Sequence, residues 1–232
     1  MENLSDMETD FIKEQKELFS KIQLTNQVDI FNLQYIAGVD LAYWKENNIE
    51  YAVCCIVIID FKTKEVVEKK YCVGEIKVPY IPGCLAFREI PLVLKTVELL
   101  ENNVDVYIFD GNGYLHTRHM GLATHAGILL DKPTIGVAKS YFNIGNINYS
   151  EPDNENFAYR DIVINNEVYG RAVRTHKNVK PVFLSIGHKV DIDTAMDIIK
   201  PLVTKESHIP IPTRYADIMT HEMRKNNSRQ LL

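Results

Sequence analysis

The sequence lacks the features of a membrane or secreted protein. None of its apolar runs approaches the ~18 residues that a membrane-spanning helix needs. The first ten residues, MENLSDMETD, have neither the basic start nor the apolar stretch of a secretory signal. These absences predict a cytoplasmic protein with no membrane partner.

Cysteine is scarce, with four residues, and none of them lies in a C-x-x-C pair or at zinc-site spacing from histidine. Cys54 and Cys55 are adjacent in an apolar run, so in a strand their side chains would face opposite sides. We expect buried, reduced thiols rather than disulfides or a zinc site. A GxxxxGK[ST] phosphate loop is also absent, which argues against a P-loop nucleotide-binding protein.

The basic excess that is usual in nucleic-acid-binding proteins is missing, because the formal net charge is −5. The charges are unevenly distributed, however. Residues 1–20 hold six acidic and two basic residues, whereas residues 171–232 hold eleven basic and six acidic residues. The C-terminal part can therefore follow a phosphate backbone, and net charge alone does not exclude a nucleic-acid substrate.

The length allows one large domain or two small ones, and we expect one α/β domain over residues 1–232, with an acidic N-terminal helix at about 7–24. Apolar runs predict strands at 35–43, 51–60, 65–74, 104–110, 133–138, 169–175 and 181–186. Helical spacing predicts helices at 85–102, 120–130, 191–202 and 213–225, and residues 141–168 read as a polar loop. An antiparallel hairpin followed by alternating strands and helices indicates a mixed β-sheet flanked by helices.

Three acidic residues stand in unusual positions. Asp40 interrupts an apolar strand, Glu89 lies on a predicted helix, and Asp110 ends a strand. Singly they can be an edge-strand aspartate, a solvated glutamate and a turn cap. Neighbouring strands would nevertheless place Asp40 and Asp110 at one end of the sheet, where a helix across the face can bring Glu89 over them. A buried charge is costly unless it is paired or binds a metal.

Three oxygen ligands without histidine or cysteine favour Mg²⁺, with Mn²⁺ as a substitute, and such a site suits phosphodiester hydrolysis. Asp217, on the predicted last helix, can complete the cluster, although exposed helical aspartates are common. Lys139 follows an apolar strand and is either a solvated lysine or a group that neutralises a phosphate in the transition state. In the segment after Asp110, His116 is either structural or functional, and glycines would let the backbone approach a ligand closely.

These residues carry a resemblance to a known family. The segments GVDLAY, PYIPG-x-LAFRE, DGNGYLH, DKPTIGVAKS and PVFLSIGHKVDIDTA, followed by PIPTRYAD, occur in this order between about Gln34 and Asp217. In order and spacing they resemble endonuclease V. The resemblance implies an RNase H-like fold and a Mg²⁺-dependent enzyme that cuts on the 3′ side of inosine, leaving 3′-hydroxyl and 5′-phosphate ends.

The resemblance also implies the roles of particular residues. The family's catalytic acids match Asp40, Glu89 and Asp110, and its active-site lysine matches Lys139. PYIPG resembles the family's wedge, with Tyr80 as the residue that stacks in the gap left by a base that has turned out of the helix. The implied substrate-binding residues are Tyr80, Ile81, Pro82, Gly83, Leu85, Gly111, Gly113 and His116.

The sequence departs from the family pattern at three positions. Cys84 stands where members usually carry an aromatic residue, Thr117 replaces a frequent proline, and Asp217 lies where other members can have histidine. Two alternatives stay open: another RNase H-like nuclease, such as a junction resolvase, and a catalytically silent binder of damaged or edited nucleic acid. The sequence leaves the choice between DNA repair and cleavage of inosine-containing RNA open, and a monomer is the simplest expectation.

Overall fold

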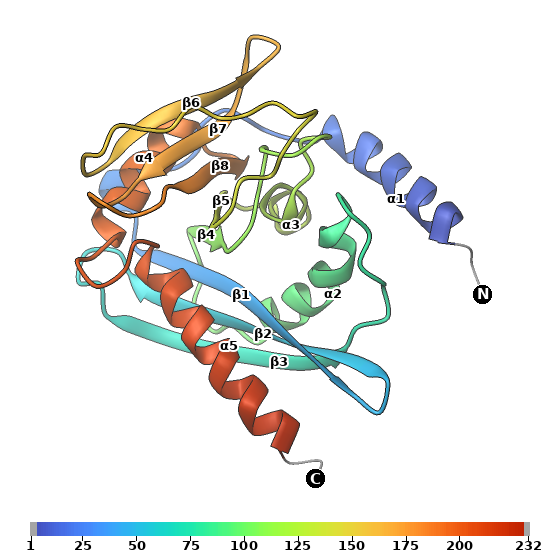
Figure 1. Ribbon diagram of the computed structural model, residues 1–232. Coiled ribbons are helices and arrows are strands. Elements are labelled where there is room, and N and C mark those ends of the chain that lie inside the picture. The colour runs from blue at the N-terminus through green and yellow to red at the C-terminus, as the bar shows by residue number, and fades with distance from the viewer. Residues whose placement is uncertain (1–3, 230–232) are drawn as a thin grey trace.

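The computed structural model describes residues 4–229, which form one eight-stranded mixed sheet with helices on both faces (Figure 1). The strand order is β3-β2-β1-β4-β5-β8-β7-β6. The strands are β1 (Tyr35–Glu46), β2 (Ile49–Asp60), β3 (Val66–Glu75), β4 (Val106–Phe109), β5 (Thr134–Ala138), β6 (Ala158–Ile164), β7 (Glu167–Arg174) and β8 (Val182–His188). The predicted α/β class and the predicted hairpin, which is β2 and β3, are confirmed.

Strand direction changes at the centre of the sheet. β1, β2 and β3 form an antiparallel meander, whereas β4 lies parallel to β1 and β5 lies parallel to β4. β8, β7 and β6 then continue the sheet in antiparallel pairs. Because β1 and β4 run the same way, their carboxyl ends meet at one edge, where functional residues can gather.

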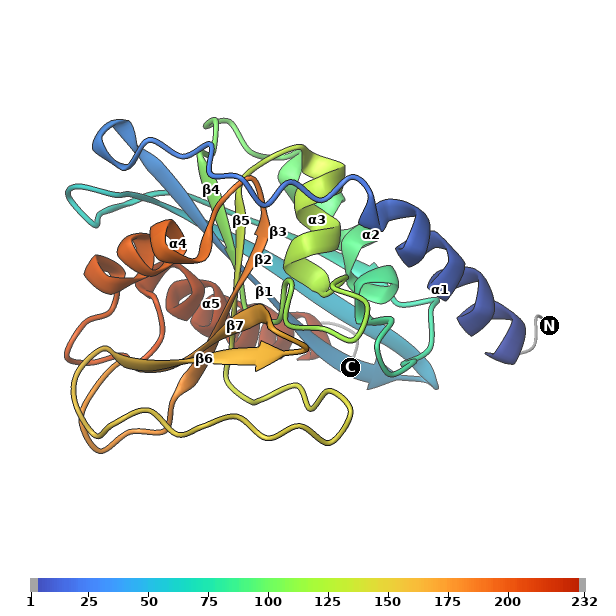
Figure 2. The same cartoon turned by 90° about the horizontal axis from the view of Figure 1, so that it is seen from above.

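Helices cover both faces of the sheet (Figure 2). α2 (Leu85–Val97) and α3 (Leu122–Leu130) pack on one face, and α4 (Ile192–Ile199) and α5 (Ile211–Arg229) pack on the other. α1 (Leu4–Phe19) lies beside α2, with the Phe11 and Phe87 rings stacked at 4.1 Å. Short 3₁₀ turns are η1 (Ile30–Asn32) and η2 (Lys200–Leu202). Within residues 4–229, no helix has an apolar stretch sufficient to cross a membrane.

The apolar periodicity of the sequence explains most of these elements. Residues 52–59 of β2 are fully buried, as expected for a strand covered on both faces. Asp191 caps α4, since its side chain accepts a hydrogen bond from the Thr194 backbone N–H. All four cysteines are free thiols, which also agrees with the prediction.

The predicted elements differ from the structure mainly in three places. The polar segment 141–168 is not all loop, because it contains β6, an edge strand that is largely exposed and therefore has no apolar run. The N-terminal helix occupies Leu4–Phe19 rather than 7–24. α2 ends at Val97 rather than at 102, and it runs uninterrupted through Pro91, which lies on its exposed side.

Candidate functional site

The carboxyl ends of β1 and β4 bring two acidic residues together. Val39 is paired with Phe109, so the next residues, Asp40 and Asp110, are neighbours across the parallel pair. The Asp110 backbone N–H donates to the Val39 carbonyl oxygen at 3.1 Å, which fixes the turn after β4. Asp40 faces α5, because its Oδ2 accepts a hydrogen bond from Thr220 Oγ1 at 3.1 Å.

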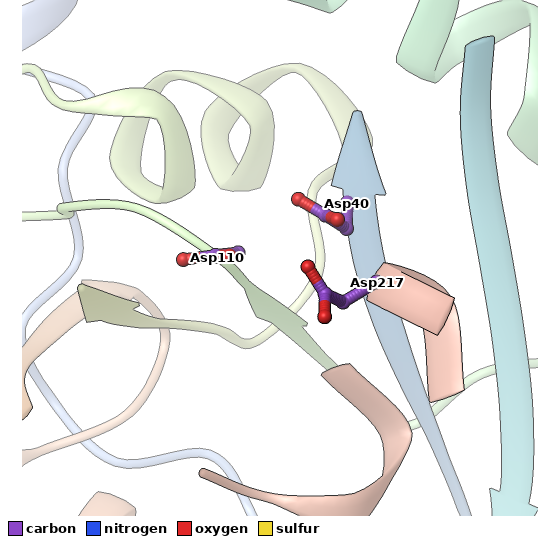
Figure 3. Close-up of side chains that lie close together, drawn as sticks. All are labelled: Asp40, Asp110 and Asp217. Carbon is purple, nitrogen blue, oxygen red and sulfur yellow. The ribbon is translucent and has the colours of Figure 1, made fainter. Parts of the chain in front are cut away.

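Asp217 of α5 completes this cluster (Figure 3). Asp40, Asp110 and Asp217 each offer one carboxylate oxygen within 4.8 Å of the others. The Asp217 side chain is only 18 % exposed, so it is not the solvated helical aspartate that the sequence left open. Three oxygen donors at this separation fit a hard divalent cation such as Mg²⁺.

Electrostatics at the cluster favour a bound cation. Burial, reinforced by the negative charge of Asp110, raises the pKa of Asp40 to about 7. Lys139 Nζ lies 2.6 Å from Asp110 Oδ2 and 3.4 Å from Asp217 Oδ1. Although burial lowers the pKa of Lys139, its hydrogen bond with Asp110 raises that pKa above the usual value overall. Arg214 Nη1 lies 3.6 Å from Asp217 Oδ2, so two positive charges face three carboxylates, and the donor set suits a divalent ion.

Glu89 lies beside the cluster rather than inside it. It is 6 % exposed on α2, which covers the sheet face opposite α5, and the Tyr43 hydroxyl donates a hydrogen bond to it. Burial raises the pKa of Glu89 to about 7, and the charges of Asp40 and Asp110 contribute to the increase. The electrostatic influence of both aspartates indicates proximity, but Glu89 does not belong to the group within 4.8 Å.

A cavity of about 130 Å³ adjoins the acids, and Gly111, the residue after Asp110, lies in its wall. Its lining residues are Tyr80, Gly83, Leu85, Ala86, Gly111, Asn112, His116, Met120, Gly121, Leu122 and Phe142. Five of the eight predicted substrate-binding residues are among them, namely Tyr80, Gly83, Leu85, Gly111 and His116. The predicted residues Ile81, Pro82 and Gly113 do not line this cavity.

Two of the predicted glycines are required for different reasons. Gly83 has a φ of +73°, and a Cβ there would lie 2.8 Å from Arg118 Nη2, so a side chain would be both strained and crowded. A Cβ on Gly113 would lie 2.2 Å from the Ile186 carbonyl oxygen. Gly113 therefore allows the loop to pack on β8, whereas Gly83 shapes the cavity itself.

His116 is a neutral hydrogen-bonding group in the cavity wall. Its Nδ1 accepts from the backbone N–H groups of Arg118 at 3.2 Å and Met120 at 3.3 Å. Its Nε2 therefore carries the proton and donates to the Gly83 carbonyl oxygen at 3.1 Å. Burial, followed by the charge of Arg118, lowers the pKa of His116 to about 4, which suits a structural donor rather than an acid catalyst.

The exposure of Tyr80 separates it from the core. Its side chain is 67 % exposed at the rim of the cavity, in the loop that precedes α2. Cys84, which replaces an aromatic residue in the resemblance, is 2 % exposed and occupies the N-cap position of α2. Tyr80 is thus free to contact a ligand, while its neighbour packs inward.

Sequence reasoning missed several residues that complete the site. Tyr43 bonds Glu89, and Thr220 bonds Asp40 from one turn beyond Asp217 on α5. The helical spacing of Thr220 from Asp217 was an available signal, because residues three apart share a face. Gln15 of α1 reaches the cavity wall from 68 residues away in the chain, and no local pattern indicates this contact.

Known proteins match this chain over most of its length. The family model for endonuclease V matches residues 16–218. An endonuclease V from Bacillus thuringiensis is 58 % identical over 216 residues, covering 93 % of this chain and 92 % of that protein. An endonuclease V from Clostridium acetobutylicum is 50 % identical over 214 residues, covering 92 % of each.

Solved structures match the chain as well. The crystal structure of endonuclease V from Bacillus subtilis has a TM-score of 0.94 and 47 % identity, covering 99 % of this chain and 95 % of that one. Ciona intestinalis endonuclease V, solved with a DNA containing an inosine followed by a ribo-adenosine, has a TM-score of 0.85 and 29 % identity, covering 95 % and 99 %. The chain therefore belongs to the endonuclease V family of nucleases.

Proposed function

We propose that the protein is a metal-dependent endonuclease that recognises inosine in a nucleic-acid strand and hydrolyses a phosphodiester bond on its 3′ side. The observation that supports this most is that a cavity of about 130 Å³ lies next to the acidic cluster. Asp110 belongs to the cluster, and the next residue, Gly111, lines the cavity. A base held in the cavity places its strand across the carboxylates. The inosine-containing DNA bound to the Ciona relative supports this choice of ligand.

Asp40, Asp110 and Asp217 would hold the metal, with Glu89 as a further ligand from the other side of the sheet edge. Bound Mg²⁺ would supply an activated water and stabilise the leaving oxygen, which gives 3′-hydroxyl and 5′-phosphate ends. Lys139 contributes a positive charge beside Asp110, where it stabilises the charge that develops on the phosphate.

The start of α2 provides a physical basis for choosing inosine. Leu85 and Ala86 line the cavity, and the first backbone N–H groups of a helix have no partner within that helix. Hypoxanthine presents a carbonyl oxygen where adenine presents an amino group. Backbone donors therefore favour the deaminated base, once it has left the stack and entered the cavity.

The topology supports an RNase H-like classification, because an antiparallel three-stranded meander continues into parallel strands β4 and β5, with the acids at their edge. A protein distinguishes RNA from DNA through contacts to the 2′-hydroxyl. We include both DNA and RNA strands as substrates in the proposal. The protein is proposed to act as a monomer.

The test uses matched DNA and RNA strands that carry inosine or adenine at one position, incubated with the protein in Mg²⁺ and in EDTA. Cleavage of inosine strands alone, 3′ to the inosine and only with metal, supports the proposal. Equal cleavage of adenine strands contradicts it. A four-way junction without inosine is a further substrate, and preferential cutting there would favour the junction-resolvase alternative.

A further inference from the structure

We propose that Gln15 of α1, together with Arg118, positions the base-recognition cavity by holding the Gly83 carbonyl group. This role rests on the proposed function, and it gives the N-terminal helix a part in inosine recognition. Gln15 is a positioning residue here, because it acts on the cavity wall and not on the base.

Gln15, Arg118 and Gly83 are connected to one another by hydrogen bonds. Gln15 Nε2 donates to the Gly83 carbonyl oxygen at 2.9 Å and to the Met120 carbonyl oxygen at 3.4 Å. Arg118 Nε donates to Gln15 Oε1 at 2.5 Å, and Arg118 Nη2 donates to the Gly83 oxygen at 2.8 Å. One buried amide thus connects two residues of the cavity lining, Gly83 and Met120.

The buried residues of α1 are Gln15 and Leu18, and Gln15 is the polar one of the two. Gln15 is 0 % exposed, whereas its neighbours Glu14 and Lys16 are exposed. Leu18, one turn later, is also buried and packs without hydrogen bonds from its side chain. A buried polar side chain is costly unless its hydrogen bonds are satisfied, and here both the amide nitrogen and the amide oxygen have partners.

The Gly83 oxygen receives three donors, from Gln15, Arg118 and His116. A carbonyl oxygen has two lone pairs, so three donors leave it no capacity to accept from a bound base. Its role is then to fix the peptide that leads through Cys84 into Leu85. The donors at the start of α2 take their orientation from this peptide, and through it from α1.

The experiment compares variants on the same helix. Gln15→Glu keeps an acceptor for Arg118 but removes the donor to Gly83, and Gln15→Leu removes both. Leu18→Ala is the matched control, since it weakens the packing of α1 without touching the hydrogen bonds. Arg118→Lys preserves the charge but loses the two-nitrogen geometry that contacts both Gln15 and Gly83.

Three quantities are measured for each variant: affinity for inosine and adenine DNA strands in Ca²⁺, the single-turnover rate at saturating inosine strand in Mg²⁺, and the melting temperature. We expect both Gln15 variants and Arg118→Lys to bind the inosine strand about tenfold more weakly, with adenine binding unchanged. The saturating rate should stay within about twofold of wild type. Leu18→Ala should lower the melting temperature and leave the inosine preference intact.

Two results would overturn the inference: a wild-type inosine preference in Gln15→Glu, or an equal loss of preference in Leu18→Ala. The second would show that α1 acts only through general stability. The inosine preference of the wild-type protein distinguishes a failure of this inference from a failure of the proposed function. A wild type without any preference for inosine would contradict the proposed function, whereas a selective wild type with equally selective Gln15 variants contradicts only the role of Gln15.

Discussion

At the scale of single residues, the acidic cluster is held against its own repulsion. Thr220 donates a hydrogen bond to Asp40, and Lys139 forms an ion pair with Asp110. The pKa of Asp40 is nevertheless raised to about 7 by burial and by the charge of Asp110. Such an arrangement is stabilised when a cation binds, because the cation restores the charge balance that burial removes. Asp217 offers a carboxylate oxygen to the same cluster as Asp40 and Asp110.

Substituting Asp217 by asparagine should therefore be as damaging as substituting Asp40 or Asp110. We expect each Asp→Asn change to reduce Mg²⁺-dependent cutting of inosine strands by more than about a hundredfold, because a metal ligand and its charge are lost together. Single-turnover assays over a Mg²⁺ titration measure the effect. Cutting by Asp217→Asn at the wild-type rate would exclude Asp217 from the metal site.

Lys139 should affect the rate more than the affinity. Its ammonium group lies 2.6 Å from Asp110, where it can neutralise charge that develops in the transition state. We expect Lys139→Ala to slow single-turnover cutting by about a hundredfold while changing affinity in Ca²⁺ by less than about threefold. A loss confined to affinity would make Lys139 a docking residue.

The sequence was sufficient to predict some of these residues but not others. Asp40 could be predicted because a charge inside an apolar strand is costly, and Asp110 because it ends another such strand. The place of Asp217 depends on how α5 crosses β1. That of Gln15 depends on how α1 lies against the loop before α2 and the loop between β4 and α3. Such tertiary placements leave no pattern in a single sequence.

At the scale of elements, prediction succeeded where burial gave a clear pattern. β2 and β8 are apolar over most of their length, and their predicted bounds lie close to the observed ones. β6 was missed because its first four residues, Ala-Tyr-Arg-Asp, do not form an apolar run. They are exposed or only partly buried, as is usual for an edge strand. Its stability comes from pairing with β7, which the sequence of β6 does not report.

The loop between β3 and α2 should act as a wedge through Tyr80. Tyr80 is 67 % exposed at the cavity rim, so Tyr80→Ala should leave the melting temperature nearly unchanged. Base–aromatic stacking is worth about 1–3 kcal/mol per base, which predicts a tenfold to hundredfold loss of affinity for inosine DNA. The loss should be larger on duplexes than on single strands, because only a duplex leaves a gap to fill. An equal loss for inosine and adenine strands would contradict the wedge.

At the scale of the whole molecule, burial shifts several titrations in opposite directions. Burial lowers the pKa values of His116 and His125 to about 4, whereas it raises those of Asp40 and Glu89 to about 7. The histidines bind fewer protons in the folded state than in the unfolded state at mildly acidic pH, and the two carboxyl groups bind more. The net pH dependence of stability is therefore a competition, and a single histidine must be isolated to test one contribution.

His125 is suited to that test, because burial is the cause of its shift and it lies on α3 away from the acids. It is 2 % exposed, and its ring meets the Phe87 ring edge-on at 4.9 Å. The ordinary pKa of 6.5 applies to the unfolded chain, and the folded value is about 4. The stability associated with neutral His125 is thus fully present above pH 6.5 and is lost as the pH falls towards 4, by an amount on the order of 3 kcal/mol.

Replacing His125 by phenylalanine removes this titration while keeping a ring against Phe87. We expect the stability of His125→Phe, measured by urea unfolding from pH 7.5 to pH 4, to rise relative to wild type as the pH falls below 6.5. His221→Phe serves as the comparison at an exposed site, because the His221 side chain is 57 % exposed. A difference between His125→Phe and wild type that stays constant over this range would show that protonation of His125 does not oppose folding.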